Sequence, residues 1–314
     1  MLRSLAALVP LVLVASLSGC GQDSAGAGAG DRVRVAAGFY ALEYVAERVG
    51  GDETEVVSLT KPGQDPHDAE LSVAQTAELA EADVVVHLSD FQPVVDDAVD
   101  QVVEGEVVDA RDSGDLVATG GEHEHADDHG HADEEGHTHE GEPDPHFWLD
   151  PTRLAAVGAD VADALAEADP GAADVYRANL RDLEDDLAAL DDEFERGLAE
   201  CRTRVVVVSH DAFGYLAHRY QLDVHAIAGL SPDSEPSPAH LPELHDLIAS
   251  EGVTTVFSER LASASMAETL SEDLGLRTAV LDPVEGLSDE TQDEDYLSLM
   301  RENVSALRAA NGCR

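Results

Sequence analysis

Eight short runs rich in Val, Ile and Thr, four on each side of one long amphipathic stretch, constrain most strongly how this chain folds. Alanine-rich segments with helical periodicity separate the runs, and this alternation is typical of α/β domains with parallel sheets. We therefore expect an α/β fold with two four-stranded parallel sheets and flanking helices. The predicted strands are Arg34–Ala37, Glu55–Leu59, Val84–Leu88 and Val107–Asp109, then Val205–Ser209, Val224–Ile227, Thr254–Phe257 and Thr278–Leu281.

The amphipathic stretch runs from about Gly171 to Glu200. Apolar residues recur there at helical spacing, at Leu180, Leu183, Leu187, Leu190, Phe194 and Leu198. A helix of about 30 residues is about 45 Å long, long enough to join two lobes. We expect an N-terminal lobe over 31–168, a linking helix over 169–200 and a C-terminal lobe over 201–314. Two shorter helices, broken near Asp191-Asp192, are the alternative.

The first 30 residues have the pattern of an export signal with a lipid attachment site. A basic start precedes an apolar segment, Leu5 to Leu17, which is shorter than the about 20 residues that span a bilayer. Leu17-Ser18-Gly19-Cys20 then has the form of a bacterial lipobox. We expect a signal peptide over 1–19, a lipidated tether over 20–30 and a protein anchored outside the cytoplasmic membrane. An ordinary signal peptide with an incidental cysteine is the alternative.

The remaining two cysteines, Cys201 and Cys313, form an even pair in an oxidising compartment. We expect a disulfide between them, with two separate buried thiols as the alternative. The chain also has 66 acidic and 18 basic residues and a net charge of −48. Such a surface repels nucleic acid, so nucleic acid is excluded as a partner.

A tract from Glu122 to Glu142 lacks apolar periodicity and holds the six histidines His123, His125, His129, His131, His137 and His139. Imidazoles and carboxylates clustered in this way make several weak, exchangeable metal sites. We expect an auxiliary metal-binding loop, with a solvated acidic insert as the alternative. Deleting 122–142 is expected to remove weak metal stoichiometry and to leave the tight site intact.

Three histidines stand in matching contexts, after a predicted strand or at a helix entrance. His67 ends P-G-Q-D-P-H, His146 lies in D-P-H-F-W-L-D-P, and His210 follows four consecutive valines. Two carboxylates, Asp282 and Glu285, directly follow the last predicted strand. Because ligands in α/β folds bind beyond the carboxyl ends of the strands, we expect these side chains to converge from both lobes.

Local signals also place the helices that follow two of these histidines. Ser72 and Gln75 have the spacing of a capping box, so a helix is expected to begin after Ser72. Asp150-Pro151 has the pattern of an N-cap followed by proline in the first helical position.

Three neutral imidazoles and one carboxylate suit tetrahedral zinc, while harder oxygen ligands favour manganese. A zinc hydrolase is the first alternative, because three histidines and a water make a catalytic zinc site. Glu259 or Glu285 is available there as a general base, but the chain has no H-E-x-x-H motif. Glu259 is otherwise expected to support one of the histidines by a hydrogen bond.

Five motifs together carry a specific resemblance to a known family. They are P-G-x-D-P-H, D-P-H-F-W-L-D-P, S-H-D-A-F-G-Y-L, G-L-S-P-x-x-E-P-S-P and L-D-P-V-E-G-L. With them, residues 31–314 resemble the substrate-binding lipoproteins of bacterial zinc and manganese ABC importers, the cluster A-I metal-binding family, and within it the zinc-uptake branch.

This resemblance implies that His67, His146 and His210 bind the metal, with Glu285 or Asp282 as the fourth ligand and a slight preference for Glu285. It further implies two lobes joined by a rigid helix, and Zn²⁺ as the cargo, with Mn²⁺ as the alternative. The partner is expected to be a membrane permease of an ABC importer with its ATPase, and the protein itself a monomer without enzymatic activity. Surface adhesion, assigned to some relatives, is a further alternative.

Overall fold

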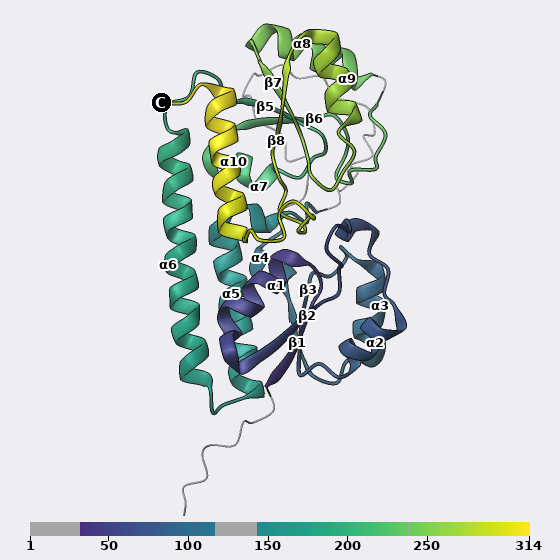
Figure 1. Ribbon diagram of the computed structural model, residues 1–314, viewed down its shortest axis with the longest axis vertical. Helices are drawn as coiled ribbons and strands as arrows, with labels where there is room; N and C mark the ends of the chain where they lie inside the picture. The colour runs from purple at the N-terminus through teal and green to yellow at the C-terminus, as the bar shows by residue number, and fades with distance from the viewer. Residues whose placement is uncertain (1–31, 117–142, 238) are drawn as a thin grey trace, which may run out of the picture. The chain divides into compact units, whose positions relative to one another are not determined.

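The computed structural model describes residues 32–116, 143–237 and 239–314. Two four-stranded, all-parallel sheets form its framework (Figure 1). The strands of the first sheet, in spatial order, are β2 (Thr54–Ser58), β1 (Val33–Ala37), β3 (Val84–His87) and β4 (Glu106–Asp109). Those of the second are β6 (Asp223–Ala226), β5 (Val205–Val208), β7 (Thr255–Ser258) and β8 (Arg277–Val280). The predicted fold class is confirmed, and each predicted strand lies within one residue of its observed bounds.

Helices connect the parallel strands, as the fold class requires. The α-helices are α1 (Tyr40–Gly50), α2 (Val73–Ala80), α3 (Pro93–Val102), α4 (Ala110–Gly114), α5 (Pro151–Ala168), α6 (Ala173–Leu198), α7 (Gly214–Tyr220), α8 (His240–Glu251), α9 (Ser265–Leu274) and α10 (Tyr296–Asn311). The described residues also contain three 3₁₀ turns: η1 (Gly51–Glu53), η2 (Pro66–Asp68) and η3 (Phe147–Leu149).

Both sheets have the same topology, because the chain order reverses between β1 and β3 in one and between β5 and β7 in the other. In register, Val35 faces Val56 and Val84, while Val207 faces Val256. All residues of β3, β5 and β7 are buried, as expected for parallel strands whose two faces are both covered. The loops beyond the carboxyl ends at such reversal points are where α/β folds bind ligands.

Helix α6 is one continuous helix of 26 residues, so the alternative of two helices broken near Asp191-Asp192 is wrong. Its predicted apolar stripe faces the core: Leu183, Leu187, Leu190, Phe194 and Leu198 are all buried. The helix packs against α1 and α5, and also against α7 and α10, so it contacts elements that precede and follow it in the chain (Figure 1).

Two predicted helix starts are confirmed. The Ser72 hydroxyl accepts a hydrogen bond from the backbone N–H of Gln75, and the Gln75 side chain accepts one from the N–H of Ser72. Asp150 caps α5 by accepting from the N–H of Thr152, with Pro151 in the first turn. Helix α7, which follows His210, begins at Gly214.

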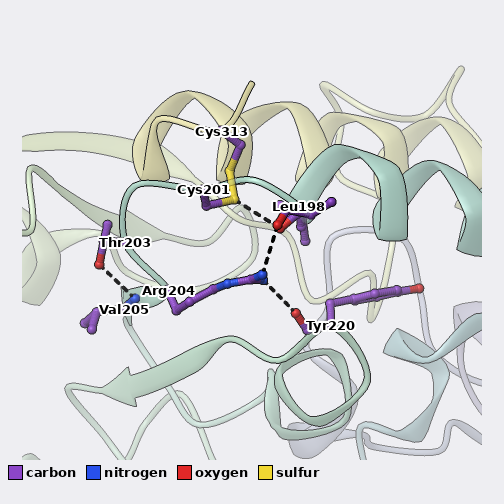
Figure 2. Close-up of a disulfide and its surroundings, with 8 residues drawn as sticks. Leu198, Cys201, Thr203, Arg204, Val205, Tyr220 and Cys313 are labelled. Atoms are coloured by element: carbon purple, nitrogen blue, oxygen red, sulfur yellow. Dashed lines mark hydrogen bonds between the residues drawn. A yellow bond between two sulfur atoms is a disulfide. The ribbon is translucent and has the colours of Figure 1, made fainter.

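The predicted disulfide between Cys201 and Cys313 is present (Figure 2). Cys201 follows the end of α6 and Cys313 follows the end of α10, so the bond ties the carboxyl ends of these two helices together. Beside it, the guanidinium of Arg204 donates hydrogen bonds of 3.1 Å to the carbonyl of Tyr220 and of 3.4 Å to that of Ala199.

The predicted signal peptide, the lipidation site at Cys20 and the histidines between 122 and 142 lie outside the described residues. Within the described part of the chain, no helix is both long enough and apolar enough to cross a membrane.

Candidate metal centre

Four of the five predicted ligands meet at one point. His67, His146, His210 and Glu285, hereafter the tetrad, each offer one donor atom, and these atoms all lie within 4.8 Å of one another. His67 follows β2, His146 precedes η3, His210 follows β5 and Glu285 follows β8. Residues from loops of both sheets therefore form a single cluster, as the sequence predicted.

Five of the six donor pairs lie near the spacing of a tetrahedral zinc site, and all six lie within 4.8 Å. Nε2 of His146 lies 3.3 Å from Nε2 of His67, 3.5 Å from Nε2 of His210 and 3.0 Å from Oε1 of Glu285. The same glutamate oxygen lies 3.2 Å from Nε2 of His67 and 3.7 Å from Nε2 of His210. Zinc–nitrogen bonds of 2.0–2.1 Å place neighbouring tetrahedral donors about 3.3 Å apart. A zinc ion therefore fits among the four donors without large movement.

The loop before His67 is fixed by its own aspartate. Asp65 caps the turn η2, and its Oδ1 accepts from the backbone N–H of His67 at 2.8 Å. The Pro66 ring restricts the backbone between them. The His67 side chain is 14% exposed, whereas those of His146 and His210 are fully buried.

His146 has the same Asp-Pro-His arrangement with one more contact. Oδ1 of Asp144 accepts from the backbone N–H of His146 at 2.9 Å and lies 2.7 Å from the ring atom Nδ1. This pairing places a proton on Nδ1 and leaves Nε2 free to bind a metal. The role of Asp144 was missed from the sequence, although the repeated D-P-H motif is a signal that could have found it.

Glu259 does for His210 what Asp144 does for His146. It directly follows β7, and its Oε2 lies 2.7 Å from Nδ1 of His210 while its Oε1 accepts from the backbone N–H at 3.2 Å. The predicted supporting contact of Glu259 is therefore present. With both its carboxylate oxygens engaged by His210, Glu259 is poorly placed to activate a water as a general base.

A sharp turn presents Glu285. Val284 has a positive φ of 56°, unusual for a β-branched residue, and it is fully buried. The turn is held on both sides: Oδ1 of Asp282 accepts from the N–H of Val284 at 2.8 Å, and the Trp148 indole donates to the carbonyl of Pro283 at 2.7 Å. These contacts over-determine the strained backbone and fix the carboxylate among the histidines.

The structure does not bring Asp282 into the tetrad. Its Oδ2 instead lies 2.9 Å from Nε of Arg260, as an ion pair and not an aligned hydrogen bond. Burial raises the pKa of Asp282 to about 6, against the opposing effects of the Val284 N–H and of Arg260. Asp282 thus supports the turn that carries Glu285.

The tetrad is electrostatically coupled. Burial favours an uncharged imidazole, but hydrogen bonds to Glu259 and Glu285 outweigh it and raise the pKa of His210 to about 10. Burial also acts to lower the pKa of His146. Hydrogen bonds to Asp144 and Glu285 outweigh it, so the pKa of His146 is raised. The histidines hold the pKa of Glu285 well below its ordinary value in spite of burial. Without a metal, protons on His146 and His210 balance the buried carboxylates.

Comparison with known proteins identifies relatives over most of the chain. Residues 35–310 match the family "Zinc-uptake complex component A periplasmic". The zinc-binding lipoprotein AdcA of Streptococcus pneumoniae is 34% identical over 308 residues, covering 97% of this chain and 59% of AdcA. This chain therefore spans less than two thirds of the length of that relative. The high-affinity zinc uptake system protein ZnuA of Bacillus subtilis is 33% identical over 299 residues, covering 93% of this chain and 92% of the relative.

Solved structures agree with the sequence comparison. The Zn(II)-bound ZnuA-like domain of S. pneumoniae AdcA superimposes with a TM-score of 0.72 at 30% identity, covering 89% of this chain and 99% of that domain. The family match, the shared fold and the tetrad agree with the resemblance inferred from the motifs. The chain is a member of the zinc-uptake complex component A family.

Proposed function

We propose that this protein binds Zn²⁺ at the tetrad outside the cytoplasmic membrane and delivers it to an ABC permease. The observation that carries the proposal is the spacing of the four donor atoms, which lie 3.0–3.7 Å apart in five of their six pairs and within 4.8 Å in all of them. Three imidazoles and one carboxylate are a donor set that suits tetrahedral zinc. Family membership supports the same cargo.

The tetrad is suited to holding a metal and not to catalysis. A catalytic zinc site keeps one coordination position open for water or substrate, whereas a closed site fills all four with protein donors. Glu285 fills the fourth position here, and Glu259 is engaged by His210. We therefore propose a transport protein without enzymatic activity, in preference to a zinc hydrolase.

Zinc is favoured over manganese as the cargo because nitrogen supplies three of the four donors. Manganese prefers oxygen ligands and a higher coordination number. In the tetrad only the carboxylate of Glu285 offers oxygen. The site therefore disfavours Mn²⁺ through the type of its donor atoms and through their number, which is four.

The remaining features of the proposal concern how the protein is organised in the cell. We propose that lipid on Cys20 anchors it, that it acts as a monomer, and that lobes over 31–168 and 201–314 are joined by a linking helix over 169–200. The relatives named as lipoproteins support the anchor. Weak metal binding by the histidines between 122 and 142 stays a prediction, and surface adhesion stays an alternative.

Metal content and calorimetry test the proposal directly. The purified, tag-free protein is expected to bind one tight equivalent of zinc, and the tight equivalent is expected to persist when residues 122–142 are deleted. Mn²⁺ should not displace the bound zinc at equal concentration. Failure to bind zinc, or hydrolysis of generic ester, peptide or β-lactam substrates by the zinc-loaded protein, would count against a transport function.

A further inference from the structure

The three histidines of the tetrad differ in what holds their rings. A carboxylate oxygen lies 2.7 Å from Nδ1 of His146 and of His210, supplied by Asp144 and Glu259. For His67, no described side chain makes a hydrogen bond to Nδ1. The most exposed histidine therefore lacks the polar contact that orients the other two.

The ring of His67 packs instead against an aromatic side chain. Phe91 meets His67 edge to face, with ring centroids 4.8 Å apart and an interplanar angle of 81°. This geometry lies within the favourable range for aromatic pairs. Phe91 is itself held by Phe39 at 5.2 Å and by Trp148 at 5.9 Å, and only 8% of it is exposed. Its ring is therefore a fixed surface against which the imidazole rests.

Gln92, the residue after Phe91, contacts the backbone of the loop that carries His67. Nε2 of Gln92 donates to the carbonyl of Pro66, the residue directly before His67, at 3.2 Å. It also lies 3.1 Å from Oγ1 of Thr60, which donates in turn to the carbonyl of Gly38 at 2.7 Å. Gln92 is almost completely buried, so this contact is shielded from water.

A turn after β3 positions Phe91 and Gln92. Asp90 adopts a positive φ of 64°, which aspartate tolerates better than most residues, and its N–H donates to Oδ2 of Asp96 at 2.8 Å. Phe91 and Gln92 follow directly, so one turn contacts both the ring of His67 and the carbonyl before it.

We propose that Phe91 and Gln92 are positioning residues for His67. The inference rests on the proposed zinc function and concerns how the third imidazole is kept in the binding geometry. His67 and Phe91 line a cavity of about 930 Å³ together with Pro145 and Leu230. As far as the described residues go, a His67 ring without its support has this space to rotate into, whereas His146 and His210 are fully buried. Phe91 and Gln92 thereby set how fast bound zinc is released.

Zinc release into excess chelator, followed by stopped flow, tests the inference. F91L removes the flat aromatic edge, F91Y retains it, and Q92M removes the amide donor while keeping the chain length. The matched control is F194L, since Phe194 is a buried phenylalanine of α6 with its own aromatic partner, Tyr220. Thermal unfolding of each metal-free variant shows whether it folds.

F91L and Q92M are expected to release zinc roughly tenfold faster than the parent, in line with other residues that orient metal ligands. F91Y and F194L should stay within about twofold. In a double-mutant cycle, F91L should have no further effect when His67 is already alanine, because a positioning residue acts only through its ligand.

Two results would overturn the inference. One is release from both F91L and Q92M no faster than from F194L; the other is an undiminished effect of F91L in the H67A background. If the parent protein itself took up no zinc, the proposed function would fall and this inference with it. The zinc content of the parent therefore distinguishes the two failures.

Discussion

Oε2 of Glu259 lies 2.7 Å from Nδ1 of His210, and both side chains are buried at the carboxyl ends of adjacent strands. The pair fixes the tautomer that presents Nε2 to the tetrad, and it increases the basicity of that nitrogen. We therefore expect Glu259, a carboxylate outside the tetrad, to influence how tightly His210 binds zinc.

Glu259→Gln keeps the size of the side chain but removes its charge. We expect zinc affinity to fall about 10- to 100-fold, because the amide neither fixes the tautomer nor stabilises positive charge on the imidazole as well. Competition with a chelator of known affinity measures the change. Glu251→Gln, at the exposed end of α8, is the control and should bind zinc like the parent. Equal affinity of the two variants would refute the role assigned to Glu259.

Replacing Glu285 and Asp282 separately by their amides distinguishes the proposed ligand from the residue that supports it. Glu285→Gln is expected to weaken zinc binding by at least about tenfold, because it removes the single charged donor of the tetrad. Asp282→Asn should retain one tight equivalent and lose mainly thermal stability, since Asp282 pairs with Arg260 and holds the turn. Calorimetry and thermal unfolding of both variants test this; loss of the tight equivalent in Asp282→Asn alone would reverse the assignment.

Zinc affinity is expected to keep rising as the pH increases above 7. Protons bind His146 and His210 in the metal-free protein, and the pKa of His210 is raised to about 10. A histidine whose pKa is raised in the folded protein contributes to the stability of the metal-free fold. This contribution is complete at a pH below the ordinary pKa of 6.5, and it is lost as the pH rises towards the raised pKa. Zinc must displace these protons, so each one adds roughly a tenfold gain in affinity per pH unit while it is bound. Calorimetry between about pH 6 and 9, in buffers of different protonation enthalpy, measures the protons released; an affinity that is flat over this range contradicts the coupling.

Trp148, the sole tryptophan, is expected to report metal binding. Its ring centroid lies 5.3 Å from that of His146, and its indole N–H donates to the carbonyl of Pro283, two residues before Glu285. Replacing protons by zinc changes the charge beside the indole, so its emission should change and saturate at one equivalent. A titration in which the emission continues to change well past one equivalent would point to a second zinc site near the indole.

The disulfide between Cys201 and Cys313 is expected to stabilise the fold without affecting the metal site. The cysteines are 112 residues apart, and closing a loop of that order is worth up to about 4.7 kcal/mol in the chain-entropy model. The double variant C201S/C313S should unfold at a lower temperature and still bind one zinc. Thermal unfolding with and without reductant checks this, and an unchanged midpoint in both experiments would show that the bond contributes little.

Much of the fold follows from local signals in the chain. Runs of β-branched residues place all eight strands, because the periodicity and the turns that end each strand are encoded within a few residues. The capping residues Ser72 and Asp150 likewise act on the next turn of their own helices. The histidines of the tetrad also stand in recognisable motifs, so their identity could be inferred before their positions.

Contacts between distant segments were decided only by the tertiary structure. Sequence left the choice between Asp282 and Glu285 open, and packing resolved their positions: Arg260 lies beside the first, and the histidines surround the second. The support of His67 by Phe91 spans 24 positions of the chain and has no local periodicity to reveal it. Short-range sequence pattern specifies where strands and helices begin and end, whereas side-chain contacts across the core depend on how those elements pack in three dimensions.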